Sequence, residues 1–193
     1  MSTITHPRIT PEELLKLPDS KRYELVEGEL IEALMSAESV WVVGRLFRRL
    51  DEFCDANGRG LVLTDGFSYQ CFPEDEDRIR RPNVSFVSPG RMTQSQFESG
   101  HGRIPPDLAA EVVSPNDLFY DVDRKANEYL QAGVKLVWVL NPDSQTIFVY
   151  HPDGTMAHLN RNEVLDGETV LPGFQCPVSS LFPDKSKLGL LTS

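Results

Sequence analysis

The run KLVWVL at residues 135–140 constrains the fold of this chain more than any other stretch. Side chains of a β-strand point alternately to opposite faces, so a strand that is apolar at almost every position is covered on both faces. The next apolar run, QTIFVYH, follows the turn Asn141-Pro142-Asp143, and we expect the two runs to pair. The sequence therefore predicts a β-sheet with packing layers on both of its faces.

Two longer segments have the spacing of amphipathic helices, because apolar side chains recur at steps of three and four. Residues 38–56, which an Asn-Gly pair should end, carry one such stripe: Val40, Val43, Phe47, Leu50 and Cys54. Residues 118–132, which a glycine should end, carry the other stripe: Leu118, Val122, Ala126, Tyr129 and Leu130. These two helices are the expected covering layers of the sheet.

Shorter elements occupy the rest of the chain. Thr10 and Glu13 match a capping box, with Pro11 in the first turn, and predict a short helix that ends near Leu17. RYELVEGELIEAL predicts a β-hairpin, and LVLTDGFSYQCF predicts two strands broken at its Asp-Gly pair. NVSFV and DLAAEVV predict two further strands, separated by a mobile polar loop over residues 88–104.

The order of these elements predicts a mixed α/β (α+β) architecture with a central mixed sheet flanked by helices. At 193 residues the chain is long enough for one domain with a sizeable core, so we expect residues 1–193 to form a single domain ending in a frayed tail over 184–193. No apolar run approaches the roughly 18 residues that cross a bilayer. With no leader pattern and three scattered cysteines expected to be free thiols, a cytoplasmic protein without a membrane partner is the expectation.

The net charge of −10 argues against nonspecific coating of nucleic acid, because phosphates are repelled at long range. It does not argue against a local basic site. An acidic balance also fits a protein that gathers carboxylates around a divalent cation, so net charge alone selects no function.

One carboxylate stands out from its surroundings. Glu111 lies inside the apolar strand LAAEVV, on the same face as Asp107 if the strand is regular. An unpaired buried carboxylate is costly, so Glu111 needs a cation, a strong donor or a raised pKa. Asp107 follows two prolines, and bonding to backbone amides at the strand entry is the alternative to a role as ligand.

Lys125 is a candidate partner for Glu111. It lies three residues after Val122 and so sits at the shoulder of the buried face of its helix, from which its stem can reach inward. The alternative is a surface ion pair with Asp121 or Glu128 on the same helix.

The segments YELVEGEL, RRPNVSFV, PPDLAAEVVSP and DRKANEYLQAGVKLVWVLNPDSQTIFVY, in that order, resemble the Uma-two family within the PD-(D/E)XK nuclease superfamily. The resemblance covers about residues 10–183. It implies a restriction-endonuclease-like core and cleavage of DNA that depends on Mg²⁺ or Mn²⁺. Homodimers are common among nucleases that cut both strands, so self-association is a further expectation.

Carried over by position, Glu111 matches the acidic residue of the (D/E)XK strand, while Val113 stands where that motif has lysine. The resemblance implies that Lys125 supplies the amine from the following helix, and that Glu24 in YELVEGEL belongs to the first motif. As half of a hairpin, Glu24 has a solvent-facing position as its alternative.

Two positions depart from the family. Asn83 stands where an aspartate is usual, and Ser39 stands where relatives often place a histidine. An amide carbonyl can bind Mg²⁺ but carries no charge, so the metal site implied by the resemblance is weakened. An asparagine before a strand is also a common turn residue, which is the plain structural interpretation of Asn83.

Two functions remain open on these grounds, beside the plainer possibility of an oligomeric protein with an unknown ligand. The first is a metal-dependent endonuclease whose catalytic residues are Glu24, Asn83, Glu111 and Lys125. Its expected metal ligands are Asn83, Glu111 and Asp107, and its expected nucleic-acid contacts are Arg80 and Arg81, for which a solvated surface is the alternative. The second is an inactive nuclease-like module that binds nucleic acid or serves as a scaffold.

Overall fold

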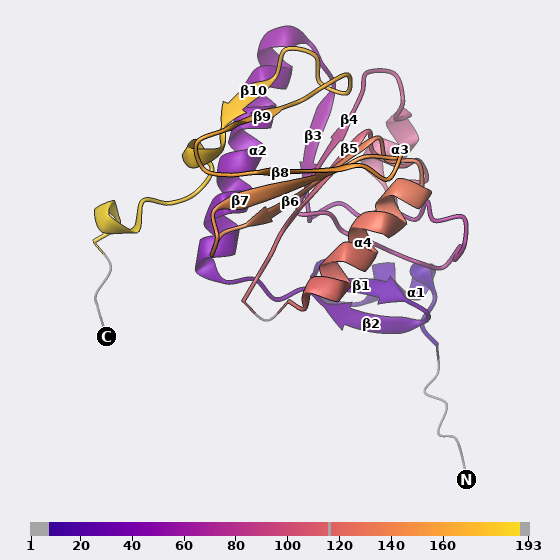
Figure 1. The fold of residues 1–193 in the computed structure, drawn as a ribbon. Helices are drawn as coiled ribbons and strands as arrows, with labels where there is room; N and C mark the ends of the chain where they lie inside the picture. Colours follow the sequence, from indigo (N-terminus) through magenta and orange to yellow (C-terminus); the bar gives the residue numbers. More distant parts are fainter. Residues whose placement is uncertain (1–7, 116, 190–193) are drawn as a thin grey trace.

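The computed structural model describes residues 8–115 and 117–189. A six-stranded sheet in the order β3-β4-β5-β6-β7-β8 forms its centre (Figure 1). Its strands are, in chain order, β3 Leu61–Thr64, β4 Val84–Val87, β5 Leu108–Val112, β6 Leu136–Asn141, β7 Thr146–Tyr150 and β8 Met156–Leu159. Two small antiparallel pairs accompany it: β1 Tyr23–Val26 with β2 Glu29–Glu32, and β9 Val164–Asp166 with β10 Gln175–Pro177.

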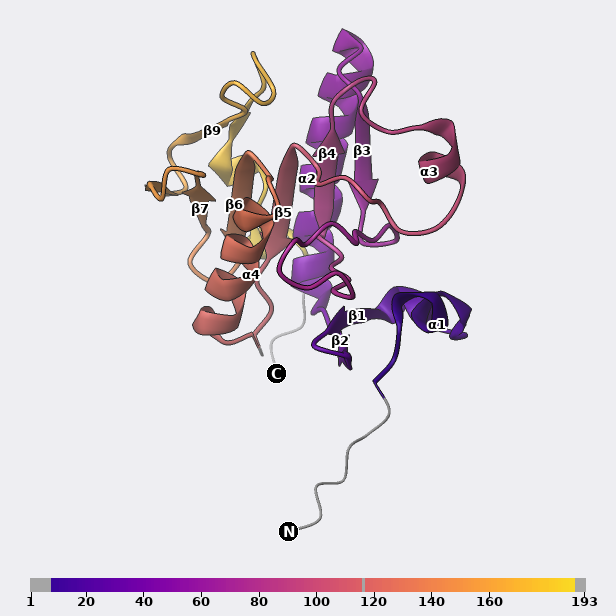
Figure 2. The same cartoon turned by 90° about the vertical axis from the view of Figure 1, so that its right-hand side faces the viewer.

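Four α-helices are present in the described residues: α1 Pro11–Lys16, α2 Ala37–Asn57, α3 Gln94–Glu98 and α4 Phe119–Gln131. The helices α2 and α4 cover opposite faces of the sheet, as comparison of the two views shows (Figure 2). β5 and β6 run parallel and are connected through α4, whereas the other neighbouring strands of the sheet are antiparallel. The predicted fold class, a mixed sheet flanked by helices, is confirmed.

Strand β6 explains why the fold has two layers against its sheet. Leu136, Trp138 and Leu140 face the core that contains α2. Val137 and Val139, the intervening residues, face the core that contains α4. The expectation that KLVWVL is covered on both faces is confirmed, and the predicted pairing with the next strand runs from Val137 opposite Tyr150 onward.

In the first half of α2 the buried residues lie one position before the predicted ones, and in the second half the two sets coincide. Its buried members are Ser39, Val42, Leu46, Leu50 and Cys54, whereas Val40 is 55 % exposed. Val43 and Phe47 lie at the flank, partly buried. Two apolar stripes overlap on this helix, and the buried one includes polar Ser39, because the Ser39 hydroxyl finds a partner in the carbonyl of Val113.

The shorter predictions are confirmed in part. The capping box of Thr10 and Glu13, the end of α1 before Leu17 and the β1–β2 hairpin are all present. The second half of LVLTDGFSYQCF forms isolated bridges at Tyr69 rather than a strand, and α3 lies inside the loop over residues 88–104. The core that contains α2 also includes Leu171 and Phe174, which lie between β9 and β10. Strand β9 has no clear signal in the sequence.

Other expectations concern the ends of the chain and its cysteines. Residues 185–187 of the tail form a 3-10 turn, and residues 190–193 lie outside the described residues. The cysteines at 54, 71 and 176 are free, as expected. In residues 8–115 and 117–189, no helix combines the length and apolarity that crossing a membrane requires.

Asp107 fixes the entry to strand β5. Its carboxylate, 1 % exposed, accepts hydrogen bonds from the Ser88 amide at 2.8 Å and from Lys135 Nζ at 2.7 Å, and it pairs with Arg91 NH1 at 2.6 Å. Burial raises the pKa of Asp107, but these three donors outweigh burial and lower it from 3.8 to about 2. The charged form therefore stabilises the connection between β4 and β5.

We predict that Asp107→Asn lowers the free energy of unfolding by about 2 kcal/mol at pH 7, because the folded-state pKa lies well below that of the unfolded chain. The contribution is complete above the unfolded-state pKa and is lost as pH falls through the folded-state pKa, so the two proteins should converge in acid. Urea denaturation at several pH values measures this. Asp143→Asn, at an exposed turn residue, is the matched control and should change little; a constant difference down to the most acid pH would contradict the prediction.

Candidate active site

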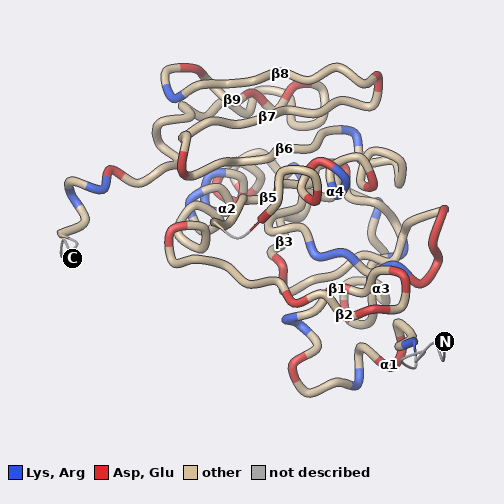
Figure 3. The backbone as a smooth tube through the Cα atoms, turned by 60° about the horizontal axis from the view of Figure 1, so that its bottom comes forward, with Lys and Arg blue, Asp and Glu red and all other residues tan. Residues whose placement is uncertain are grey.

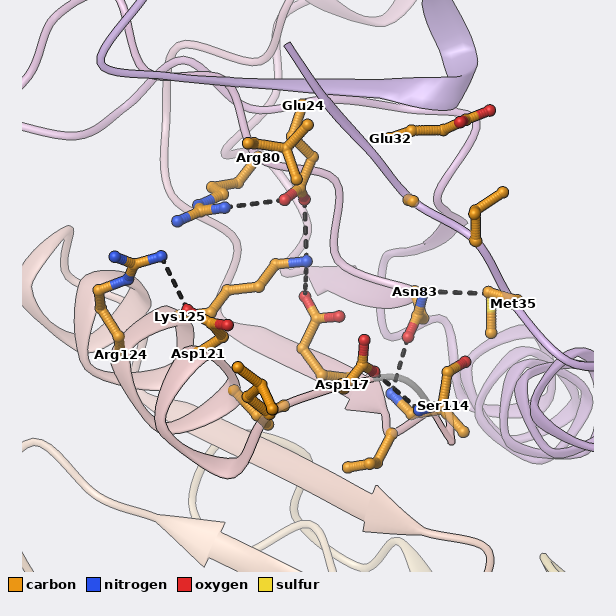
Figure 4. A pocket seen from close by; sticks show the side chains of 18 of the residues that line it. Glu24, Glu32, Met35, Arg80, Asn83, Ser114, Asp117, Asp121, Arg124 and Lys125 are labelled. Atoms are coloured by element: carbon orange, nitrogen blue, oxygen red, sulfur yellow. Dashed lines mark hydrogen bonds and ion pairs between the residues drawn. The ribbon is translucent and has the colours of Figure 1, made fainter. Parts of the chain in front are cut away.

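A lysine held between two buried carboxylates is the centre of the candidate site (Figure 4). Lys125 Nζ on α4 lies 2.9 Å from Glu24 Oε1 and 3.0 Å from Glu111 Oε1. The expectation that Lys125 reaches inward is confirmed, and its surface alternative is wrong. Burial lowers the pKa of Lys125, but the two carboxylates outweigh burial and raise it, so the ammonium form is stabilised.

Glu111 lies at the carboxyl end of strand β5, where the sheet meets α4. It is 7 % exposed, and its Oε1 accepts a hydrogen bond from the Tyr129 hydroxyl at 2.8 Å in addition to the contact with Lys125. Burial and the neighbouring Glu24 raise the pKa of Glu111, and this increase exceeds the opposing effect of Lys125. The cation and strong donor that a carboxylate in this apolar strand requires are therefore both present.

Glu24 reaches the same place from the β1–β2 hairpin. It is 3 % exposed, so its solvent-facing alternative is wrong. Its Oε2 pairs with Arg80 NH1 at 2.9 Å, and its Oε1 accepts the backbone N–H of Arg81 at 2.7 Å. Burial raises the pKa of Glu24, but Lys125 and Arg80 outweigh burial and lower it, so Glu24 is held as a carboxylate.

Arg80 and Arg81 have internal partners. Both are 4 % exposed, and Arg80 also pairs with Glu128 Oε2 at 2.6 Å. Arg81 donates to backbone carbonyls of Tyr23 at 2.9 Å and Ser20 at 3.2 Å. The alternative that these two arginines lie on a solvated surface is therefore wrong. Contact with nucleic acid stays a prediction, but both guanidinium groups already bind acidic side chains or carbonyls of the protein.

Asn83 lines the same cavity as Glu111 and is 7 % exposed. Figure 4 shows it between Met35 and the end of β5. Its Oδ1 accepts the backbone N–H of Val112 at 2.7 Å, and its Nδ2 lies 3.6 Å from the sulfur of Met35. The amide therefore connects the entry of β4 to the end of β5. One lone pair of the carbonyl that was expected to bind metal is occupied by this hydrogen bond.

Asp107 is not part of this cluster. It precedes β5 whereas Glu111 lies near its end, four residues on and so roughly 13 Å away at the rise of a strand. Its carboxylate is taken up by Ser88, Lys135 and Arg91. The prediction that Asp107 is a metal ligand together with Glu111 is not supported by this placement, whereas bonding at the strand entry is observed.

Several residues at the site were not predicted from the sequence. Tyr129, which was assigned to the apolar stripe of its helix, follows Lys125 by one helical turn, and this spacing is the signal that places both at Glu111. Ser114 Oγ donates to Ser39 Oγ at 3.2 Å, and the Ser114 amide donates to Asp117 Oδ2 at 2.7 Å. The serine at position 39 thus belongs to a hydroxyl cluster at the amino end of α2, next to the site.

The cluster borders a cavity of about 310 Å³ between the hairpin, the end of β5 and α4. Glu24, Asn83, Glu111 and Lys125 all line it. Asp117 and Asp121 line it from the start of α4. Arg80 lines it as well, so five of the sequence-predicted site residues are brought together around one space.

The oxygen donors suit a hard cation in kind, but they are few. The recorded contacts of the Glu111 carboxylate fall on Oε1, which leaves Oε2 for a ligand, and the Asn83 carbonyl keeps a second lone pair. In the part of the chain that the structure describes, no three Asp, Glu, His or Cys side chains are grouped to hold a metal ion. Mg²⁺ usually retains waters and takes only one or two protein carboxylates, so the residues fit Mg²⁺ or Mn²⁺ as a weak site.

We predict strong coupling between Lys125 and Glu111. Lys125→Met leaves two buried carboxylates without their shared cation, and Glu111→Gln removes one of them, so the double variant should be more stable than the sum of the single effects by about 1–3 kcal/mol. A double-mutant cycle measured by urea denaturation gives this coupling. The exposed helical pair Arg48 and Glu52, at 2.7 Å, is the control cycle and should show little; additive effects at the buried pair would mean that the contact is not formed.

The chain is similar to known nuclease-like proteins in sequence and in fold. The family model Uma2, described as "Putative restriction endonuclease", matches residues 11–179. A crystal structure of a putative nuclease belonging to DUF820, from Anabaena variabilis, superposes with a TM-score of 0.76 at 20 % identity, covering 90 % of this chain and 97 % of that one. No curated protein matches. A match over residues 11–179 includes the hairpin, the sheet and the cluster around Lys125, and the chain belongs to the Uma2 family of restriction-endonuclease-like proteins.

Proposed function

We propose that this protein is a metal-dependent nuclease that hydrolyses phosphodiester bonds of DNA at the cavity beside Lys125. The observation that carries the proposal is the approach of Lys125 Nζ to Glu111 Oε1 at 3.0 Å inside that cavity. A buried carboxylate beside a partly buried ammonium, open to a space that can admit a phosphate, suits phosphodiester hydrolysis. Membership of the Uma2 family supports the reaction class.

Glu111 Oε2 and the Asn83 carbonyl are the groups that would hold Mg²⁺ or Mn²⁺. Once bound, such an ion polarises a phosphate and lowers the pKa of a bound water. The carboxylate of Glu111 supplies the only formal charge of this pair, and the Tyr129 hydroxyl fixes its orientation at 2.8 Å. The orientation of Glu111 therefore does not depend on the metal.

Lys125 provides the positive charge on the opposite side of Glu111. Its ammonium can donate hydrogen bonds to an attacking water or to a phosphate oxygen, and so can stabilise the negative charge that develops in the transition state. Glu24 keeps Lys125 charged and directed into the cavity, at 2.9 Å. Arg80 in turn keeps Glu24 ionised.

The neutral side chain at position 83 favours a second function. A carboxylate next to a divalent cation contributes several kcal/mol of attraction even at the effective dielectric of a protein surface, and Asn83 lacks that charge. Its Oδ1 is also engaged by the Val112 amide at 2.7 Å. On this ground the alternative is a nuclease-like fold that binds nucleic acid, or acts as a scaffold, without cleavage.

We predict that the wild type nicks supercoiled plasmid DNA with Mg²⁺ or Mn²⁺ and not with EDTA, and that Glu111→Ala and Lys125→Ala abolish nicking. Agarose gels over a time course measure this. If the wild type is inactive at every metal concentration while Asn83→Asp is active, the binding or scaffold function is correct instead.

We further predict that Asn83→Asp tightens Mn²⁺ binding at least about tenfold, because it restores a negative charge at the cavity. Isothermal titration calorimetry gives the affinity. Asn162→Asp, at an exposed residue far along the chain, adds the same charge and should leave the affinity unchanged. Equal affinities for wild type and Asn83→Asp would show that position 83 does not contact the ion.

A further inference from the structure

A second cavity of about 160 Å³ lies directly beside the first. The two spaces share Val113, Asp117 and Val122 in their walls, so a ligand at one is adjacent to a ligand at the other. The second cavity lies between the first turn of α4 and the face of the sheet that α4 covers. Its floor includes Val139 of β6 and its neighbour Phe148 of β7, which are paired across the two strands.

The walls of this cavity combine three aromatic residues with three valines, and Asp117 and Asn141 are its polar members. Phe119 comes from α4, and Phe148 and Tyr150 come from β7. Phe148 stacks on His158 of β8 with ring centroids 4.7 Å apart and an interplanar angle of 20°, so His158 covers one face of the Phe148 ring and holds it in place. Two strands and one helix thus bring aromatic side chains to this cavity: Phe148 and Tyr150 from β7, with Phe148 supported by His158 of β8, and Phe119 from α4.

The residues at the start of α4 are exposed and apolar to an unusual degree. Leu118, Phe119 and Tyr120 are successive residues with exposures of 62 %, 74 % and 61 %. The Arg124 guanidinium lies over the Tyr120 ring, 5.4 Å from its centroid. A cluster of exposed apolar residues at the rim of two cavities indicates a binding surface rather than ordinary surface composition.

The volume of the second cavity and its lining residues indicate which class of ligand it can bind. Cavities for drug-sized ligands begin at roughly 300 Å³, so this one suits a smaller group such as one planar ring system. A nucleobase has two flat apolar faces and stacks on aromatic side chains whatever its identity. Lys and Arg positions alternate with Asp and Glu positions along the described backbone (Figure 3), and the net charge is −10, so we assign stacking a larger share of the affinity than phosphate contact.

We propose that the second cavity binds one unpaired nucleobase of the nucleic acid, next to the phosphodiester at the Lys125 site. The proposal rests on the nuclease function proposed above and adds a substrate class, because a base can enter this cavity only from a single strand or after leaving a duplex. Phe119 is the best residue to test, because it lines the cavity but is 74 % exposed, so its removal should cost the fold little.

Fluorescence of a single-stranded hexadeoxynucleotide that contains one 2-aminopurine tests the proposal. Titrations with EDTA and with Ca²⁺ use the wild type, Phe119→Ala and, as matched control, Phe97→Ala on α3, whose side chain is 58 % exposed. We expect the wild type to quench the probe, Phe119→Ala to bind about tenfold more weakly because a stacked base contributes about 1–3 kcal/mol, and Phe97→Ala to bind as the wild type does. The same probe annealed to its complement should bind more weakly than the single strand.

Equal binding by Phe119→Ala and Phe97→Ala, or equal binding of single strand and duplex, overturns the proposal. So does a wild-type dimer on size-exclusion chromatography that Phe119→Ala dissociates while binding of the oligonucleotide is unchanged, because the surface would then contact a second copy of the chain. Plasmid nicking by the same variants separates the two functions. If the wild type nicks plasmid but oligonucleotide binding does not depend on Phe119, only the proposed base site is wrong. If binding depends on Phe119 but no nicking occurs at any metal concentration, only the proposed nuclease function is wrong.

Discussion

Compensation of buried charge is the constraint on which the rest of this structure depends. Glu24 and Glu111 are both almost fully buried, and a carboxylate in that position is tolerated only with a cation and hydrogen-bond donors. Lys125 serves both carboxylates at once, and Arg80 supports Glu24. Hairpin, sheet and α4 therefore have to assemble together, because each brings one member of a set that is costly when incomplete.

The sequence predicts the local elements well and the buried arginines poorly. KLVWVL is recognisable as a two-sided strand because its apolar pattern is independent of its partners. The pairing of Glu111 with Lys125 could be anticipated because a carboxylate in an apolar strand requires a cation. Arg80 and Arg81 look like a surface cluster, since their partners, Glu24 and Glu128, lie more than 40 residues away in the chain. Such pairs depend on topology, which periodicity does not encode.

Asn83 illustrates how a structural role and a possible chemical role coincide at one residue. Its Oδ1 satisfies the Val112 amide before strand β4, and its Nδ2 lies 3.6 Å from the sulfur of Met35. The side chain is 7 % exposed and a buried carboxylate there would need a cation, so the fold without a metal favours a neutral residue. The misassigned stripe of α2 has a related origin, because Ser39 is buried through a hydrogen bond to Val113 that hydrophobic spacing cannot reveal.

The β1–β2 hairpin is paired within itself and does not belong to the six-stranded sheet, at whose lower edge it lies in Figure 1. It is attached to the rest of the molecule by a two-hydrogen-bond bridge between Leu25 and Ile79, by the buried cluster that these residues form with Leu14, and by the ion pairs of Glu24. The hairpin thus brings one of the two carboxylates to the site from outside the sheet, and Lys125, Arg80 and the Arg81 amide hold that carboxylate there. The site is closed by side-chain contacts across a docked element and not by the hydrogen-bond register of the sheet.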